Sequence, residues 1–263
     1  KWAIDTQITS DKMTDAAIAL LDDAKNVDGR FFLYMQYLDP HADYKRHPDA
    51  PKFGAKARDM YDSEVAFTDR QVGRLLDHIA SKPWADRTTV ILTSDHGEAF
   101  GENGMWRHGF ELWEVLVRVP LVVYVPGVEP RRVAARRSHI DLVPTCLELL
   151  AVPLPAGDDA NDFLSGVSLL PDVFLEPGSQ PAERDILIDM PGGPYNESRR
   201  AFIHGDLKLI ISRGTHKELF NIEKDPKESR NLWSDKEQRK KIADRYAAVK
   251  ARLREIKVTG KFK

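Results

Sequence analysis

Residues 88–118, TTVILTSDHGEAFGENGMWRHGFELWEVLVR, decide the fold because a short apolar run ends in polar side chains. The run from Thr88 to Thr93 is β-branched and apolar, which is typical of a strand buried on both faces of a parallel sheet. Asp95 and His96 follow it directly, and in open α/β sheets ligands bind outside the carboxyl ends of the strands. A carboxylate beside an imidazole suits a divalent cation. The stretch therefore predicts a metal site with Asp95 and His96 as ligands.

A second strand end of the same kind lies upstream, after residues 31–38 (FFLYMQYL). This almost continuous apolar run predicts another central strand, and Asp39-Pro40-His41 follows it. A lone histidine after a strand is more often a satisfied surface residue than a functional one. Two polar strand ends in one chain favour the functional interpretation, so His41 becomes a candidate site residue.

The remaining elements follow from hydrophobic spacing and turn residues. Helices are expected at 13–25 and 56–80, the second with one apolar face formed by Tyr61, Val65, Thr68, Val72, Leu75, Leu76 and Ile79. A strand is expected at 120–125, and Asp141 is expected to cap the helix that follows it. Four short strands, at 185–190, 200–204, 207–212 and 217–222, predict a small antiparallel sheet that precedes a helix over 235–256. The prediction is an α/β domain over 1–182, with a central sheet flanked by helices, and a C-terminal subdomain over 183–263.

Composition sets outer limits on the function. With 263 residues, 42% of them hydrophobic, the chain can bury a sizeable core. The net charge of −2 gives no basic field that would favour nucleic acid, and no apolar run reaches the roughly 18 residues of a membrane span. The single cysteine, Cys146, excludes an internal disulfide framework. Four arginines within 129–137 indicate a solvated edge, with contact to an acidic substrate as the minority interpretation.

The longer motifs resemble the sulfatase branch of the alkaline phosphatase superfamily. SDHGE at 94–98 is followed by GENG at 101–104, His108-Gly109 and RVPLVVYVPG at 118–127. HIDLVPTCLELLAV at 139–152, GVSLLP at 166–171 and ELFNIEKDPKE at 218–228 are also similar to family segments. The resemblance implies an alkaline phosphatase-like central sheet and a small C-terminal antiparallel sheet plus helix.

The resemblance also implies roles for individual residues. Asp95 and His96 would bind a divalent metal, calcium first, with manganese, magnesium and zinc left open. His41 and His108 would be the catalytic residues that contact the substrate anion or the leaving group; His108 stands near where some members carry lysine. Glu98, Asn103 and Arg107 shape the pocket or stabilise the loop. Asp43 occupies a position where proline is usual in the family, which affects loop rigidity.

Two family features are expected outside these 263 residues. Complete members open with an Asp-Asp metal pair and a nucleophile, which in sulfatases is a formylglycine made from cysteine. Cys146 is followed by Leu-Glu-Leu in an apolar helix and is read as a small buried hydrophobe. Asp22-Asp23 lies inside a predicted helix, not at a strand end. Because the resemblance covers only the later part of the family, we expect the C-terminal portion of a sulfatase that is inactive alone.

Two alternatives stay open. A phosphoryl-group enzyme of the same superfamily, such as a phosphoethanolamine transferase-like protein or a phosphodiesterase, also carries SDHGE and a downstream His-Gly; ELFNIEKDP at 218–226 favours a sulfatase. A non-catalytic binding module is the best interpretation if the native chain starts at Lys1. The expected substrate is a small-molecule or saccharide sulfate ester, selected by loops 43–56 and 153–183. The resemblance suggests a periplasmic or extracellular protein and leaves the oligomeric state unassigned.

Overall fold

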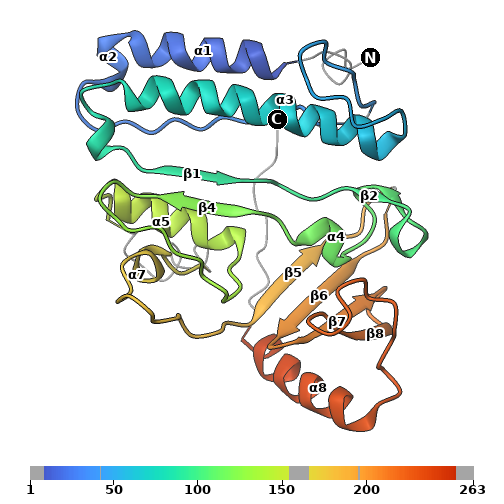
Figure 1. Cartoon of the computed structure of the whole chain (residues 1–263). Coiled ribbons are helices and arrows are strands. Elements are labelled where there is room, and N and C mark those ends of the chain that lie inside the picture. The colour runs from blue at the N-terminus through green and yellow to red at the C-terminus, as the bar shows by residue number, and fades with distance from the viewer. Residues whose placement is uncertain (1–8, 42, 154–165, 195, 253–263) are drawn as a thin grey trace. The chain divides into compact units, whose positions relative to one another are not determined.

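The computed structural model describes residues 9–41, 43–153, 166–194 and 196–252 (Figure 1). The chain divides into two compact units, Lys1–Thr88 and Thr89–Lys263, each of which is described by itself. The expected domain boundary between 182 and 183 falls inside the second unit and stays a prediction. Among the described residues, no helix combines the length and the apolar composition that crossing a bilayer requires.

The first unit is built on two helices that pack against each other. These are α1 (Ser10–Asp22) and α3 (Ala57–Ala80), accompanied by the short helices α2 (Ala24–Val27) and η2 (Ala85–Arg87). Ala17 and Leu21 of α1 meet Leu75 of α3 in a buried cluster, because residues one helical turn apart share a face. The two helices predicted from apolar spacing are confirmed.

The buried face of α3 differs from the predicted one. Val65 and Leu76 are 42% and 40% exposed, whereas Glu64, Phe67 and Gln71 are buried. Polar side chains occupy this face because they have partners inside the unit: Glu64 accepts a hydrogen bond from a backbone amide, and Gln71 accepts one from Arg74. A prediction that assigns burial by hydrophobicity alone misses such paired groups.

The prediction of a central strand at 31–38 is wrong, because no strand forms there in the described part of the chain. The segment has no strand partner there, although its side chains alternate as in an extended chain. Phe31, Leu33 and Met35 pack against the α1 and α3 cluster, while Phe32 and Tyr34 are 63% and 73% exposed. Apolar composition supplies one packed face, but a strand also needs a hydrogen-bonded neighbour.

The second unit begins with a pair of strands, β1 (Val90–Thr93) and β4 (Leu121–Tyr124). They are antiparallel, with Thr93 opposite Leu121. The expectation of a parallel strand buried on both faces was therefore wrong for the described residues: Leu92, Val122 and Tyr124 are 37%, 56% and 56% exposed. Since residues directly opposite or two apart share a face of the sheet, these three lie on the same exposed side.

The C-terminal sheet follows the predicted strands closely. Its strands are β5 (Ile186–Met190), β6 (Arg199–His204), β7 (Leu207–Ser212) and β8 (His216–Asn221), all antiparallel and in that order. Helix α8 (Lys236–Lys250) follows, and Asp235 caps it by accepting hydrogen bonds from two backbone amides of its first turn. The small antiparallel sheet and the terminal helix are thus confirmed, with residues 253–256 of that predicted helix outside the described residues.

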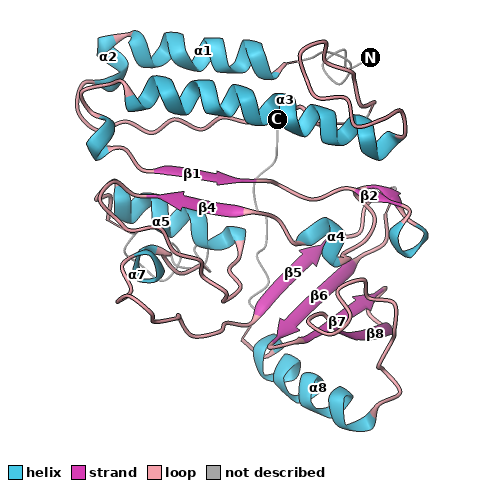
Figure 2. Cartoon of the chain, viewed as in Figure 1, coloured by secondary structure: helices cyan, strands magenta, loops and turns pink. Residues whose placement is uncertain are grey.

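Both faces of this sheet are covered, which explains why residues 207–211 of β7 are all buried. One face packs on Leu112, next to helix α4 (Glu114–Val117). The other face packs on Ile242 of α8, which lies along the sheet in Figure 2. Successive residues of β7, such as Leu209 and Ile210, therefore enter different cores.

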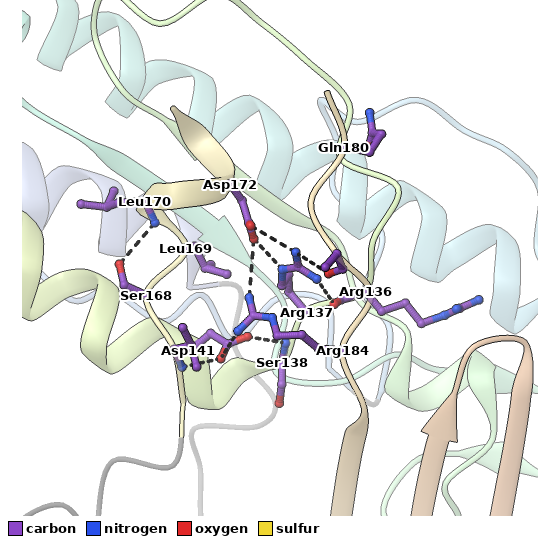
Figure 3. A network of polar contacts seen from close by, with 12 residues as sticks. Arg136, Arg137, Ser138, Asp141, Ser168, Leu169, Leu170, Asp172, Gln180 and Arg184 are labelled. Atoms are coloured by element: carbon purple, nitrogen blue, oxygen red, sulfur yellow. Dashed lines mark hydrogen bonds and ion pairs between the residues drawn. The ribbon is translucent and has the colours of Figure 1, made fainter. Parts of the chain in front are cut away.

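A polar network joins the arginine-rich segment to the helices that follow it (Figure 3). These helices are η4 (His139–Asp141), α5 (Leu142–Leu149) and α7 (Leu170–Val173). Arg137 makes a two-point ion pair with Asp172, and Arg184 reaches Asp141 at 3.3 Å. The side chain of Arg137 is only 6% exposed, so the expected solvated edge is wrong at this residue.

Candidate functional site

The turn after β1 is shaped by side chains that bond to nearby backbone. The Thr93 hydroxyl donates to the carbonyl of Pro120 at 2.8 Å, which fastens the end of β1 to the start of β4. The Ser94 hydroxyl donates to the carbonyl of His96 at 2.6 Å, and the Asp95 carboxylate accepts the amide of His96 at 3.0 Å. Ser and Asp favour such local bonds, so this sequence turns sharply where the strand ends.

Asp95 and His96 present two possible metal ligands side by side. The His96 Nδ1 lies 2.9 Å from the carbonyl oxygen of Gly97, and because a carbonyl only accepts, Nδ1 carries the proton. The lone pair is then on Nε2, which lies 3.8 Å from Asp95 Oδ2. Histidines that bind metals are commonly fixed by a hydrogen bond of this kind on the other ring nitrogen.

Gly97 allows the strand end to approach α4 closely. Its amide donates to the carbonyl of Leu116 at 2.7 Å. A Cβ at this position would lie 2.0 Å from the carbonyl oxygen of Val115, which no real side chain tolerates. Glycine is therefore required here by close backbone approach.

His108 stands beside this pair. Its ring centroid is 4.1 Å from that of His96, with 30° between the ring planes. Its Nδ1 lies 3.0 Å from Oε2 of Glu98, whose side chain is 4% exposed. The structure thus brings Asp95, His96 and His108 together at one strand end, and it adds Glu98 as a contact of His108.

The loop between Glu98 and His108 is a short hairpin. Strands β2 (Ala99–Phe100) and β3 (Trp106–Arg107) pair across η3 (Glu102–Gly104). Asn103 has a φ of 51°, so it serves the turn in which GENG reverses the chain. Of the residues predicted to shape the pocket or stabilise the loop, Glu98 contacts a candidate catalytic residue and Asn103 lies in the turn of the hairpin.

His41 belongs to the first unit, where it is exposed after the buried Asp39. The expectation that His41 acts with Asp95, His96 and His108 stays a prediction.

Asp95 and His96 offer the types of donor atom that divalent cations bind. A carboxylate oxygen and an Nε2 lone pair are ligands that calcium, manganese, magnesium and zinc all accept to different degrees. Within the described residues, however, no group of three or more His, Cys, Asp or Glu side chains is arranged to hold a metal. Asp95 and His96 therefore supply two candidate donors, and their assignment as metal ligands stays a prediction.

Cys146 lies in α5, half-buried, and burial raises the pKa of its thiol. A raised pKa reduces the thiolate fraction that a nucleophile needs. The structure agrees with the interpretation of Cys146 as a packing residue.

The sequence comparisons identify the family. The family model described as Sulfatase matches residues 5–152. The choline-sulfatase of Rhizobium meliloti (strain 1021) is 27% identical over 201 residues, which are 74% of this chain and 38% of that protein. The uncharacterized sulfatase YidJ of Escherichia coli (strain K12) is 32% identical over 172 residues, 64% of this chain and 32% of that protein. The chain spans about a third of the length of these relatives.

Solved structures show the same fold. Ps i-CgsB superposes with a TM-score of 0.72 at 22% identity, covering 92% of this chain and 55% of that one. BT4656, solved with its substrate D-glucosamine-2-N,6-O-disulfate, has a TM-score of 0.58 at 24% sequence identity. The match covers 76% of this chain and 42% of that one. The phosphonate monoester hydrolase of Agrobacterium radiobacter has a TM-score of 0.60 at 24% sequence identity. The match covers 74% of this chain and 41% of that one.

The fold class is that of the alkaline phosphatase-like α/β proteins, with a small C-terminal antiparallel sheet plus helix. Within that class, the chain belongs to the sulfatase family. The resemblance inferred from SDHGE and the later motifs is confirmed.

Proposed function

We propose that this chain supplies the metal-binding strand end and the leaving-group histidine of a sulfuric ester hydrolase. The observation that carries the proposal is the cluster after β1. There, a carboxylate and an imidazole with a fixed tautomer lie 3.8 Å apart, and the ring of His108 lies against His96 with 4.1 Å between the ring centroids. Family membership adds the expectation of sulfate ester hydrolysis.

Asp95 and His96 would hold the metal through Oδ2 and Nε2, and calcium is the proposed ion, ahead of manganese, magnesium and zinc. A bound divalent cation would neutralise oxygens of the sulfuryl group. Glu98 would accept from Nδ1 and thereby orient the ring, and the imidazolium form of His108, with Nε2 also protonated, would donate a proton or a hydrogen bond to the leaving oxygen. His41 would bind the sulfate anion.

The proposed substrate is a small-molecule or saccharide sulfate ester. Support comes from the choline-sulfatase among the relatives and from the neighbour solved with a disulfated glucosamine. A phosphoryl-group enzyme is the second candidate, because a phosphonate monoester hydrolase shares the fold. We also propose a periplasmic or extracellular location.

The test compares hydrolysis of an aryl sulfate with that of an aryl phosphodiester by the native protein, before and after chelation. Asp95→Ala and His96→Ala should abolish turnover and lower the bound metal measured by mass spectrometry, while Glu176→Ala, an exposed carboxylate elsewhere in the unit, should change neither. Preference for the phosphodiester would replace the first candidate with the second. Full turnover in both site variants would refute the metal site.

The nucleophile needs a separate test, because Cys146 is the single cysteine of these 263 residues. Peptide mapping of the native protein should find a cysteine-derived formylglycine and an unmodified Cys146. The 263 residues alone should show no turnover and only weak metal affinity. A native protein that begins at Lys1 would favour the non-catalytic binding module.

A further inference from the structure

The segment that carries His41 is tied down just before this histidine. The Asp39 carboxylate accepts hydrogen bonds from the amides of Thr9 and Ser10, at 2.9 and 2.7 Å, and from the Ser10 hydroxyl at 2.7 Å. The Thr68 hydroxyl of α3 donates to the backbone carbonyl of Asp39 at 3.2 Å. Asp39 is therefore fixed to the start of α1 and to α3, which leaves its carboxylate engaged in structure.

A second tie follows shortly after His41. Glu64 of α3 is 2% exposed, and its Oε1 accepts the backbone amide of Lys45 at 2.7 Å. Hydrogen bonds from a backbone amide to a carboxylate are stronger than those between neutral groups. The backbone around His41 is thus held from both sides by buried carboxylates.

His47 lies beside this tie and packs on α3 through its ring. Its ring is 3% exposed and stacks on Phe67 of α3, with centroids 3.8 Å apart. Nε2 lies 3.5 Å from Glu64 Oε1, but neither ring nitrogen makes a hydrogen bond to a described residue, and Glu64 Oε2 also has none there. Buried polar atoms without partners reduce stability, so a merely structural role would be served better by apolar side chains of similar volume.

Burial raises the pKa of Glu64 to about 7 and lowers that of His47. Each group would therefore be neutral over part of the neutral pH range, which is how a buried pair of this kind avoids a permanent unpaired charge. The charged groups that face the pair are Asp11, Asp39, Lys45 and Arg70.

We propose that Glu64 is a positioning residue for His41: through the Lys45 amide it fixes the backbone that follows His41 against α3. The inference rests on the proposed function, in which His41 binds the sulfate anion. Small displacements of a group that binds the reacting anion lower the rate strongly, so the anchor should be visible in catalysis.

The test is a double-mutant cycle in the complete protein. Glu64→Leu should lower kcat/KM for an aryl sulfate about tenfold, and Glu64→Gln, which keeps an oxygen for the Lys45 amide, should restore most of it. In a His41→Ala background Glu64→Leu should cause little further loss, because the residue that it positions is gone. Leu75→Ala, which loosens the same unit toward the other end of α3, controls for stability.

Independent, additive losses from Glu64→Leu and His41→Ala would overturn the positioning role, as would a loss in Leu75→Ala equal to that in Glu64→Leu. Hydrogen exchange at the Lys45 amide supplies a readout that needs no turnover: it should accelerate in Glu64→Leu and not in Glu64→Gln. Absence of sulfatase turnover in the unmodified protein would overturn the proposed function and this role together, whereas turnover with additive losses overturns the role alone.

Discussion

Replacing Lys208 with methionine should destabilise the second unit strongly. Lys208 is completely buried on β7, and its Nζ lies 3.0 Å from Glu114 Oε1 and 2.9 Å from Glu228 Oε1. Glu228 also accepts the backbone amide of Glu114 at 2.5 Å. Methionine fills a similar volume but leaves two carboxylates without their cation.

The size of the effect follows from this geometry. Removing one partner of a buried ion pair costs about 3 to 5 kcal/mol, and Lys208 serves two carboxylates. For a unit of this size that corresponds to a fall in melting temperature of about 10 °C. Burial already raises the pKa of Glu228, and loss of Lys208 raises it further, so protonation should relieve part of the penalty. The loss should therefore be larger at high pH than at low pH.

Thermal melts followed by tryptophan fluorescence at two pH values would measure this. Lys224→Met, at an exposed position of the same unit, is the matched control and should leave the melting temperature unchanged. The combined replacement of Lys208 by Met with both glutamates changed to Gln should recover part of the stability, because no buried charge then remains. A shift in Lys208→Met as small as that of the control, or independent of pH, would refute the reasoning.

The same substitution bears on the candidate site. Glu114 begins α4, and the Leu116 carbonyl of that helix accepts the amide of Gly97. Loosening the start of α4 should therefore loosen the turn that holds Asp95 and His96, and turnover should fall before global unfolding begins.

Three further outcomes are expected. Gly97→Ala should lower the stability by about 2 kcal/mol, because the added Cβ would lie 2.0 Å from the Val115 carbonyl oxygen; thermal melts measure this loss. The same substitution should reduce turnover, which aryl sulfate assays measure. The stabilising effect of protonated Glu64 is complete below pH 4.5 and is lost as the pH rises through about 7. The natural chain should therefore lose about 3 kcal/mol of unfolding free energy relative to Glu64→Gln across that window, as measured by denaturant titrations. His47, whose pKa is lowered, acts in the opposite sense below pH 6.5 and is common to both proteins. Cys146→Ser should leave turnover unchanged, and a loss beyond that explained by stability would contradict its assignment as a packing residue.

Much of the architecture was predictable because its signals are local. The two long helices, the four C-terminal strands and the capped terminal helix all depend on side-chain spacing and turn residues within a few positions. The strand end at Asp95 and His96 was predictable for the same reason, since an apolar run ends there in adjacent polar residues. The family followed from motifs spread along the chain, and the sulfatase match confirmed it.

The tertiary structure decided what depends on partners distant in sequence. A strand requires a neighbour, so the run at 31–38 has the composition of a strand and yet has no pairing among the described residues. The burial of Glu64 depends on a backbone amide from another segment. The burial of Lys208 depends on two carboxylates from other segments. The contact between the His96 and His108 rings likewise depends on how the hairpin at 99–107 folds back. Sequence alone determined which groups the protein has and the approximate positions of its two long helices and its C-terminal strands. Which of those groups meet, and which apolar run finds a strand partner, was set by packing, because contact energies act through space and not along the chain.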